Sequence, residues 1–451
     1  MSNGREPVVE TMSGSDTLLW TIGADPVLRQ TVVAVLTLDS PPDWLRLRER
    51  LNELTGIVPR LRSHGVTRPV IVGRPQFAED TEFDLDFHVR RTLLPQGSSW
   101  RDVLRMAEHM GTVAFDPLLP PWEAMVVEGL EGGRAAIIVK LHHALVDGVG
   151  GIAVLGHLLD TSRKAPSRKS PPASPRTEPG SFDPMKSVRQ LGRTAAAAVQ
   201  AAAQPTATAR RLMSTGTSVA RLLAPAGAPL SHVMTGRSFR RNFEVLDLPK
   251  GKLRRAATAT GSTLNDVFVT AVVRGLRRYH ELHGADMHEL RALMPVNVRH
   301  DGEVLGGNHF VPARFRVYTG EDASDCLQRT RKITGEWKHA SGLAVSEVVA
   351  TGLSLLPGAV TTSLWGRMLK GDDFCITNVP GPPFRAYVAG SRVQQMYAFA
   401  PTSGAALNVS LLSVDGCECV GVNMDLAAVP DGSKLVMCLE EGFAEVFALA
   451  D

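Results

Sequence analysis

The sequence predicts an α/β protein of two domains, each a mixed β-sheet with flanking helices. The chain has 451 residues, for which two domains are the natural expectation. Apolar runs typical of buried strands alternate with amphipathic helical patterns. Residues 161–181 are rich in Pro, Ser, Arg and Lys, as linkers are. We therefore expect domains at 1–160 and 237–451, joined by a basic linker and crossover helices at 161–236.

The elements of the first domain are predicted by their periodicity. Strands are expected at 31–38, 124–127 and 134–141, and helices at 43–55 and 149–160. The strands at 124–127 and 134–141 should form a hairpin through the turn at Gly132 and Gly133. In the second domain we expect a strand at 243–248 and a helix from Thr263 to about His280, with Thr263 or Asn265 near its N-cap.

Composition narrows the class of protein. Hydrophobic residues make up 44% of the chain and charged residues 21%, which suits a globular protein with a sizeable core. The five cysteines are scattered, and Cys417-x-Cys419 alone is a weak metal or redox signal, so we expect no metal site and a reducing compartment. No signal peptide is evident. The uncharged run at 348–366 is broken by Pro357 and two glycines, and predicts packed or interfacial helical pieces rather than a membrane span.

Positive charge is concentrated in the crossover. Residues 162–241 hold 14 Lys and Arg against two carboxylates, a net of +12, which leaves −9 for the rest of a chain whose total is +3. The helix expected at 184–204 places Lys186, Arg189 and Arg193 beside an apolar face. Two interpretations stay open, a solvated crossover and an element that binds an anionic membrane surface. Nucleic acid is disfavoured because no aromatic residues interleave the basic ones.

The segment His142-His143-Ala144-Leu145-Val146-Asp147-Gly148 carries the chemistry. It follows a buried strand and precedes a helix. A neutral imidazole there can take a proton from an attacking hydroxyl, and Asp147 near the helix N-terminus can accept backbone N–H groups. Gly148 permits a tight turn. A paired core histidine and a helix-capping aspartate are the structural alternative, but two histidines with Asp-Gly at such a junction favour catalysis.

This HHxxxDG motif resembles that of the CoA-dependent acyltransferase superfamily, which includes chloramphenicol acetyltransferases, condensation domains and bacterial wax ester synthase/diacylglycerol acyltransferases (WS/DGAT). Further phrases resemble the last of these families. They are Ser13-x-x-Asp16, Asp116 to Pro121-Trp122, Asn265-Asp266, and Thr377-Asn378-Val379-Pro380-Gly381-Pro382. Together they extend the resemblance from about residue 12 to residue 440.

The resemblance implies two chloramphenicol-acetyltransferase-like domains with the active-site channel between them. His143 would deprotonate the acceptor hydroxyl, which would attack the acyl-CoA thioester with no acyl-enzyme, while His142 and Asp147 support the loop. The acceptor would be diacylglycerol or a long-chain alcohol, and no cofactor is implied beyond acyl-CoA as substrate. The oxyanion donor stays open among Asn265, Asn378 and backbone amides.

Structural roles are also open for several motif residues. For Trp122 a rigid turn with a buried indole is favoured over catalysis, and for the Asn265-Asp266 pair the alternative is helix capping and hydrogen bonding between domains. The family usually has a carboxylate where this chain has Gly23, and a leucine where it has Pro121. A Tyr often seen in the family is missing from the phrase at Ser413.

These departures leave two rivals. One is an HHxxxDG acyltransferase that uses a carrier-bound thioester, and the other is a catalytically weak paralogue that coats lipid bodies. The intact HHxxxDG motif argues against the second. For the enzyme we expect a cytoplasmic location, peripheral to the inner face of the plasma membrane or to lipid bodies. The sequence indicates no oligomeric state.

Overall fold

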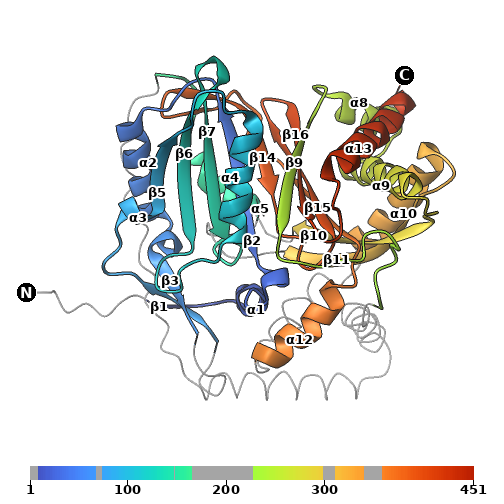
Figure 1. The fold of residues 1–451 in the computed structure, drawn as a ribbon, viewed down its shortest axis with the longest axis horizontal. Helices are drawn as coiled ribbons and strands as arrows, with labels where there is room; N and C mark the ends of the chain where they lie inside the picture. The colour runs from blue at the N-terminus through green and yellow to red at the C-terminus, as the bar shows by residue number, and fades with distance from the viewer. Residues whose placement is uncertain are drawn as a thin grey trace, which may run out of the picture.

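The computed structural model describes residues 9–67, 74–146, 148–164, 227–297, 310–339 and 358–450. The helix predicted at 184–204 and Asp147 lie outside these described residues. Within them the architecture is mixed α/β, with two large sheets that each carry helices (Figure 1), as predicted.

The described elements up to residue 160 make up the first half of the chain. They are β1 (Val9–Thr11), α1 (Gly14–Ile22), β2 (Thr31–Leu38), α2 (Trp44–Ile57), β3 (Ser63–Val66), β4 (Gln76–Glu79), α3 (Leu85–His88), β5 (Val89–Leu93), α4 (Trp100–Thr112), β6 (Trp122–Leu130), β7 (Arg134–His142), α5 (Gly148–Gly156) and β8 (Leu159–Asp160).

The described elements from residue 241 onward make up the second half. They are β9 (Arg241–Leu248), α8 (Lys252–Ala259), α9 (Leu264–Leu282), β10 (Glu289–Asn297), β11 (Phe310–Tyr318), α10 (Ala323–His339), α12 (Gly358–Leu369), β12 (Phe374–Val379), β13 (Tyr387–Val388), β14 (Ser391–Phe399), β15 (Leu407–Val414), β16 (Cys417–Asp425) and α13 (Gly432–Phe447).

The first sheet has seven strands in the order β5-β6-β7-β2-β14-β13-β8. Only β5 and β6 pair in parallel; the other neighbours are antiparallel. Two of its strands, β13 and β14, come from the second half of the chain. β14 pairs with β2 over Val33 to Leu38 and so fills the position that β2 would otherwise leave as an open edge.

The second sheet has six strands in the order β11-β10-β12-β15-β16-β9, and β12 is parallel to both of its neighbours. The helices α9, α10 and α13 lie together on its outer side, near the C-terminus (Figure 1). The two sheets meet closely at Gly421 of β16, where a Cβ would lie 2.2 Å from the carbonyl oxygen of Ala398 in β14. Only glycine permits this approach of the two backbones.

Each sheet has its own hydrophobic core, and α1 packs with α12 in a third cluster through Leu18, Ile22 and Trp365. On the first sheet α4 packs closely against Val33, because a Cβ added at Gly111 of α4 would contact the valine side chain. In Figure 1, α4 crosses in front of β7 and β2, and α12 lies below both sheets.

Most of the predicted elements are confirmed. β2 has the predicted bounds, β6 and β7 form the predicted hairpin, and Thr263 is the N-cap of α9. The helix predicted at 149–160 is wrong at its end, because α5 stops at Gly156 and Leu159 pairs with Val388 in a sheet. None of the helices in the described part of the chain combines the length and apolar character needed to cross a bilayer.

Candidate active site

The turn after β7 is held by backbone hydrogen bonds. The amide of His142 donates to the carbonyl of Pro121 (2.9 Å), and the amide of His143 donates to the carbonyl of Gln30 (2.8 Å). The amide of Leu145 then donates back to the carbonyl of His142 (3.0 Å). The residues just before β6 and β2 thus fix both histidines at the end of β7, where the sequence predicted them.

His142 is a buried, neutral side chain. Its ring packs against Trp20 at 4.9 Å and Phe115 at 6.2 Å between centroids. Its Nδ1 accepts a hydrogen bond from the amide of Ala144 (3.1 Å), which places the ring proton on Nε2. Burial, with a smaller contribution from neighbouring His143, lowers the pKa of His142 to about 3. A ring with this pKa is a poor proton acceptor at neutral pH.

His143 lies where two cavities meet. The larger cavity, of about 220 Å³, lies between α5, α2 and the first sheet and reaches β12 and β15 of the second. The smaller cavity, of about 100 Å³, is bounded by α1, α12 and strands of the second sheet. His143 lines both cavities, as do Pro295, Thr377 and Ala400. One imidazole therefore faces two compartments.

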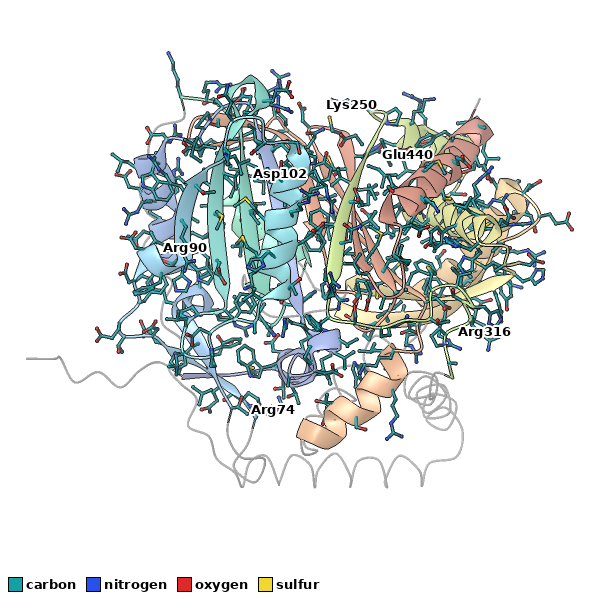
Figure 2. The ribbon with its side chains drawn as sticks, viewed as in Figure 1. Arg74, Arg90, Asp102, Lys250, Arg316 and Glu440 are labelled. Atoms are coloured by element: carbon teal, nitrogen blue, oxygen red, sulfur yellow. The ribbon has the colours of Figure 1, made fainter. Side chains whose placement is uncertain are left out.

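The described linings of both cavities contain no Asp, Glu, Lys or Arg. The charged side chains labelled in Figure 2, such as Arg90, Lys250 and Arg316, lie on the outside of the molecule. The larger cavity is walled mainly by Val, Leu, Ile and Ala, with Asn378 and Ser410 among its few polar side chains. The polar side chains of the smaller cavity include Gln30, Ser403 and Asn408. Both cavities thus suit uncharged, largely apolar ligands.

Gly148 is where the two halves of the protein touch at the motif. A Cβ at this position would lie 2.9 Å from Cγ2 of Val379 at the end of β12. A side chain at this position would therefore require the Val379 side chain to shift. The glycine of HHxxxDG thus permits the close packing of α5 on β12.

Trp122 is buried and structural as well as cavity-lining. Its indole Nε1–H donates to the carbonyl of Leu61 (2.7 Å), and its ring stacks on His88 at 4.7 Å. His88 donates through Nδ1 to the carbonyl of Trp122 (2.8 Å), and burial lowers its pKa. The indole closes one wall of the larger cavity, in keeping with the packing role favoured from the sequence.

The Asn265-Asp266 pair lies outside the lining of the larger cavity and holds one lining residue in place. Asn378 lines the larger cavity, and its Nδ2 donates to Oδ1 of Asn265 (2.5 Å). Asp266 is buried, completes a capping box with Thr263 and accepts a hydrogen bond from Thr334 (2.5 Å). The structure therefore brings Asn378, but not Asp266, into the cavity that His143 lines.

Arg60 was not among the predicted site residues, yet it braces the motif. It forms an ion pair with Asp16, which is fully buried (Nη1 to Oδ2, 3.0 Å), and donates to the carbonyl of Ala144 (3.1 Å). It also pairs with Glu10. Arg60 thus ties the Ser13-x-x-Asp16 phrase to the turn that carries His143. In the sequence, the one indication of this role was the position of the arginine directly after Val58-Pro59.

No cluster of three or more His, Cys, Asp or Glu that could hold a metal occurs in the described part of the chain. Cys375 lines the smaller cavity, where its thiol donates to the carbonyl of Thr402. Burial raises the pKa of this thiol well above its ordinary value. Cys375 is therefore not activated as a thiolate nucleophile.

Solved structures show that this fold is known from other proteins. The wax ester synthase/diacylglycerol acyltransferase from Marinobacter aquaeolei VT8 superposes with a TM-score of 0.65 at 20% identity, over 98% of this chain and 99% of that one. The first condensation domain of the CDA synthetase gives 0.68 at 18% identity, over 98% and 96%. The fold is that of two chloramphenicol-acetyltransferase-like domains.

Sequence comparison then identifies the family. The wax ester synthase/diacylglycerol acyltransferase catalytic domain matches residues 12–268, and the WS/DGAT C-terminal domain matches residues 306–446. The chain belongs to this acyltransferase family. A provisionally named diacylglycerol O-acyltransferase of Mycobacterium tuberculosis is 32% identical over 95% of this chain and 89% of its own length. Another from the same organism is 28% identical over 97% of both chains.

Proposed function

We propose that this acyltransferase moves a long-chain acyl group from acyl-CoA to the hydroxyl of diacylglycerol, which gives triacylglycerol and CoA. A long-chain alcohol as acceptor would give a wax ester instead. The observation that carries the proposal is the position of His143, which faces both uncharged cavities at once. The provisional names of the Mycobacterium tuberculosis relatives favour diacylglycerol as the acceptor.

His143 acts as the general base in this proposal. Its imidazole takes the proton of the acceptor hydroxyl as the oxygen attacks the thioester carbonyl carbon. The tetrahedral intermediate then collapses, the C–S bond breaks, and the imidazolium returns the proton to the CoA sulfur. The raised pKa of Cys375 supports direct transfer without an acyl-enzyme. His142 supports the turn, because its Nδ1 accepts a hydrogen bond from the amide of Ala144.

Two donors lie near the place where the oxyanion would form. Asn378 uses one N–H of its amide on Asn265 and has a second N–H to give. The N-terminus of α5 begins at Gly148, which lines the larger cavity, and presents backbone N–H groups with partial positive charge. Loss of one such donor costs about 10²–10³-fold in rate. Asn378→Ala should lower kcat by that amount.

Both hydrogen-bond donors, Asn378 and the N-terminus of α5, border the larger cavity. We therefore assign this cavity to the acyl chain of acyl-CoA. The smaller cavity then receives the acceptor, and its Gln30, Ser403 and Asn408 suit the ester and hydroxyl oxygens of a diacylglycerol. Leu19→Phe narrows this cavity and should raise the acceptor KM about fourfold or more, roughly one displaced CH₂. Leu118→Phe, at an exposed leucine, is the matched control.

The central test is an assay of purified protein with labelled palmitoyl-CoA and a panel of acceptors. Diacylglycerol should be acylated ahead of hexadecanol, and acceptors from C4 to C16 should be used with rising rate, because each buried CH₂ contributes about 0.8 kcal/mol. A flat chain-length profile, or preference for a small polar amine, would reject the lipid acceptor. Transfer from a palmitoylated carrier protein but not from palmitoyl-CoA would establish the carrier-dependent rival. Tight lipid binding without turnover would establish the weak paralogue.

The reaction as proposed needs no cofactor or metal. Every step uses only groups of this protein, acyl-CoA and the acceptor. Activity should therefore survive dialysis against a chelator and gel filtration. Loss of activity that zinc or another cation restores would contradict this part of the proposal.

The enzyme is also proposed to work from the cytoplasm at an anionic membrane or lipid-body surface. The support is the net charge of +12 over residues 162–241, at about 1 kcal/mol per basic residue near such a surface. Sedimentation with vesicles should require anionic lipid and weaken with salt. Changing Lys186, Arg189 and Arg193 to Glu should release the protein, whereas the same change at the dispersed, exposed Arg90, Arg105 and Arg316 should not. Equal sedimentation of both variants would exclude the crossover as the anchor.

A further inference from the structure

Residues that pair across neighbouring strands of the first sheet line the larger cavity in successive rows. We call each such row a rung, and the rungs lie at increasing distance from His143. Val32 pairs with Leu141 nearest the histidine, Ala34 pairs with Val139 one rung on, and Leu36 pairs with Ile137 beyond that. All of these except Ile137 line the cavity. Because alternate residues of a strand face the same side, each rung lies about 6.6 Å beyond the previous one.

The second rung is made largely of alanine. Ala398 of β14 pairs with Ala34, and Ala124 of β6 pairs with Val139. All three alanines line the cavity, opposite the wall that Gly151, Ile152 and Leu155 of α5 provide. At this depth β2, β6 and β14 therefore present only methyl groups beside Val139 of β7, whereas the same strands carry Val32, Trp122 and, one rung beyond, Leu36 and Met396.

Burial shows where the straight part of the cavity ends. Val32 and Ala34 are half-buried, but Leu36 is 1% exposed. Strand β14 behaves in the same way, since Ala398 is half-buried and Met396, which pairs with Leu36, is fully buried. Leu36 and Met396 form the floor of the cavity, about 13 Å along the strand from Val32.

We propose that the alanine rung, Ala34, Ala124 and Ala398, is the gate that lets an acyl chain longer than about six carbons enter the larger cavity. This rests on the proposed function and adds a specificity determinant to it. A staggered alkyl chain with C–C bonds of about 1.5 Å advances about 1.3 Å per carbon. The alanine rung then lies about five carbons beyond the carbonyl, and the floor about ten. A longer chain continues beneath α2, where Leu51 and Leu54 line the same cavity.

The gate is rigid because β14 cannot retreat from an added side chain. The carbonyl of Ala398 already abuts Gly421 of the second sheet, where there is no room even for a Cβ. Strand β2 is held between β7 and β14. A leucine at position 34 or 398 must therefore occupy the space of the acyl chain itself.

The test compares hexanoyl-CoA with palmitoyl-CoA in the parent and in Ala398→Leu. We expect hexanoyl transfer within about threefold of the parent and a drop of at least tenfold in palmitoyl kcat/KM, since each excluded CH₂ costs about fourfold in affinity. Ala153→Leu, on α5 but outside the lining, should change neither rate. An equal loss on both substrates by folded Ala398→Leu, or no loss on palmitoyl-CoA, would overturn the proposal.

Two further measurements keep the gate separable from the reaction. Ala34→Val adds fewer atoms and should give the same selectivity in weaker form, which tests the gate even if the leucine variant does not fold. Calorimetric binding of the two acyl-CoAs needs no turnover. If the parent transfers neither acyl group, the proposed function fails. The gate would still be supported if the parent binds palmitoyl-CoA and this binding is lost in Ala398→Leu and weakened in Ala34→Val. Unchanged binding in those variants would reject it.

Discussion

His142 and His143 are neighbours in sequence, but their surroundings are opposite. His142 points away from the cavity face of β7, lies under Trp20 and has a pKa of about 3. His143 faces both cavities on the other side. The difference lies entirely in what each ring touches, since the residue type is the same. One imidazole is part of the scaffold, and the other is placed to react with substrates.

The largest effect should come from removing the ring that faces the cavities. His143→Ala should lower kcat by at least about 10²-fold while the protein stays folded, because the general base is lost. Steady-state kinetics with palmitoyl-CoA and thermal unfolding would measure the two effects. His109→Ala, at an exposed histidine of α4, is the control and should be neutral. Near-normal turnover in His143→Ala would mean that another group takes the proton.

The support shared by both histidines is Arg60, and its loss should chiefly affect stability. Arg60→Met removes the ion pair to the buried carboxylate of Asp16 and the hydrogen bond to the carbonyl of Ala144. We expect the free energy of unfolding to fall by about 3–5 kcal/mol. Arg48→Met, which breaks an exposed ion pair with Asp86, should cost about 1 kcal/mol or less. Denaturant titration distinguishes them, and Asp16→Asn should recover part of the Arg60→Met loss.

The scaffold histidine should make the folded state sensitive to acid. An unfolded histidine binds its proton near pH 6.5, but folded His142 does so only near pH 3. Between these values the unfolded state binds more protons, so stability is full above pH 6.5 and falls as the pH is lowered. The slope for this group is about 1.4 kcal/mol per pH unit. His142→Gln should flatten the dependence of unfolding free energy on pH, and an unchanged slope would show that other groups govern it.

The smallest effect should come from Gly23, where the family usually has a carboxylate. A Cβ there would lie 3.3 Å from Nε2 of His142, the atom that carries the proton. Gly23→Glu should therefore raise the pKa of His142 above about 3, because a nearby negative charge favours the imidazolium. Histidine NMR titration would detect the shift. Gly56→Glu, where a side chain meets open space, should leave the titration unchanged.

Local sequence predicted much of the fold because the strands of the first sheet are continuous apolar runs. Thr31–Leu38 is such a run, and its bounds agree with the structure. The position of β14 beside β2 was not predictable in this way, since the partner is more than 350 residues away and no local pattern specifies it. The position of Leu159 was not predictable either. Its helical spacing assigned it to the helix, but it pairs with Val388 of a strand distant in sequence.

The lining of the larger cavity could be predicted in part. The motifs of the sequence include His143, Gly148, Trp122 and Asn378, and the structure brings all four to this cavity. Arg60 was missed because an ion pair to Asp16 forms only when separate segments meet. The alanine rung could not be recognised either, because small residues on three strands resemble ordinary sheet packing until their register is known. Asp147 remains a prediction.

The position of β14 also has a consequence for biosynthesis. During translation β2 leaves the ribosome early, yet its partner arrives only after about 360 further residues, on the order of tens of seconds later at typical rates. Throughout that interval one edge of β2 has backbone N–H and C=O groups open to pairing with other nascent chains. The growing polypeptide is therefore a natural client for chaperones. Truncation before residue 391 should yield insoluble material rather than a free-standing first domain.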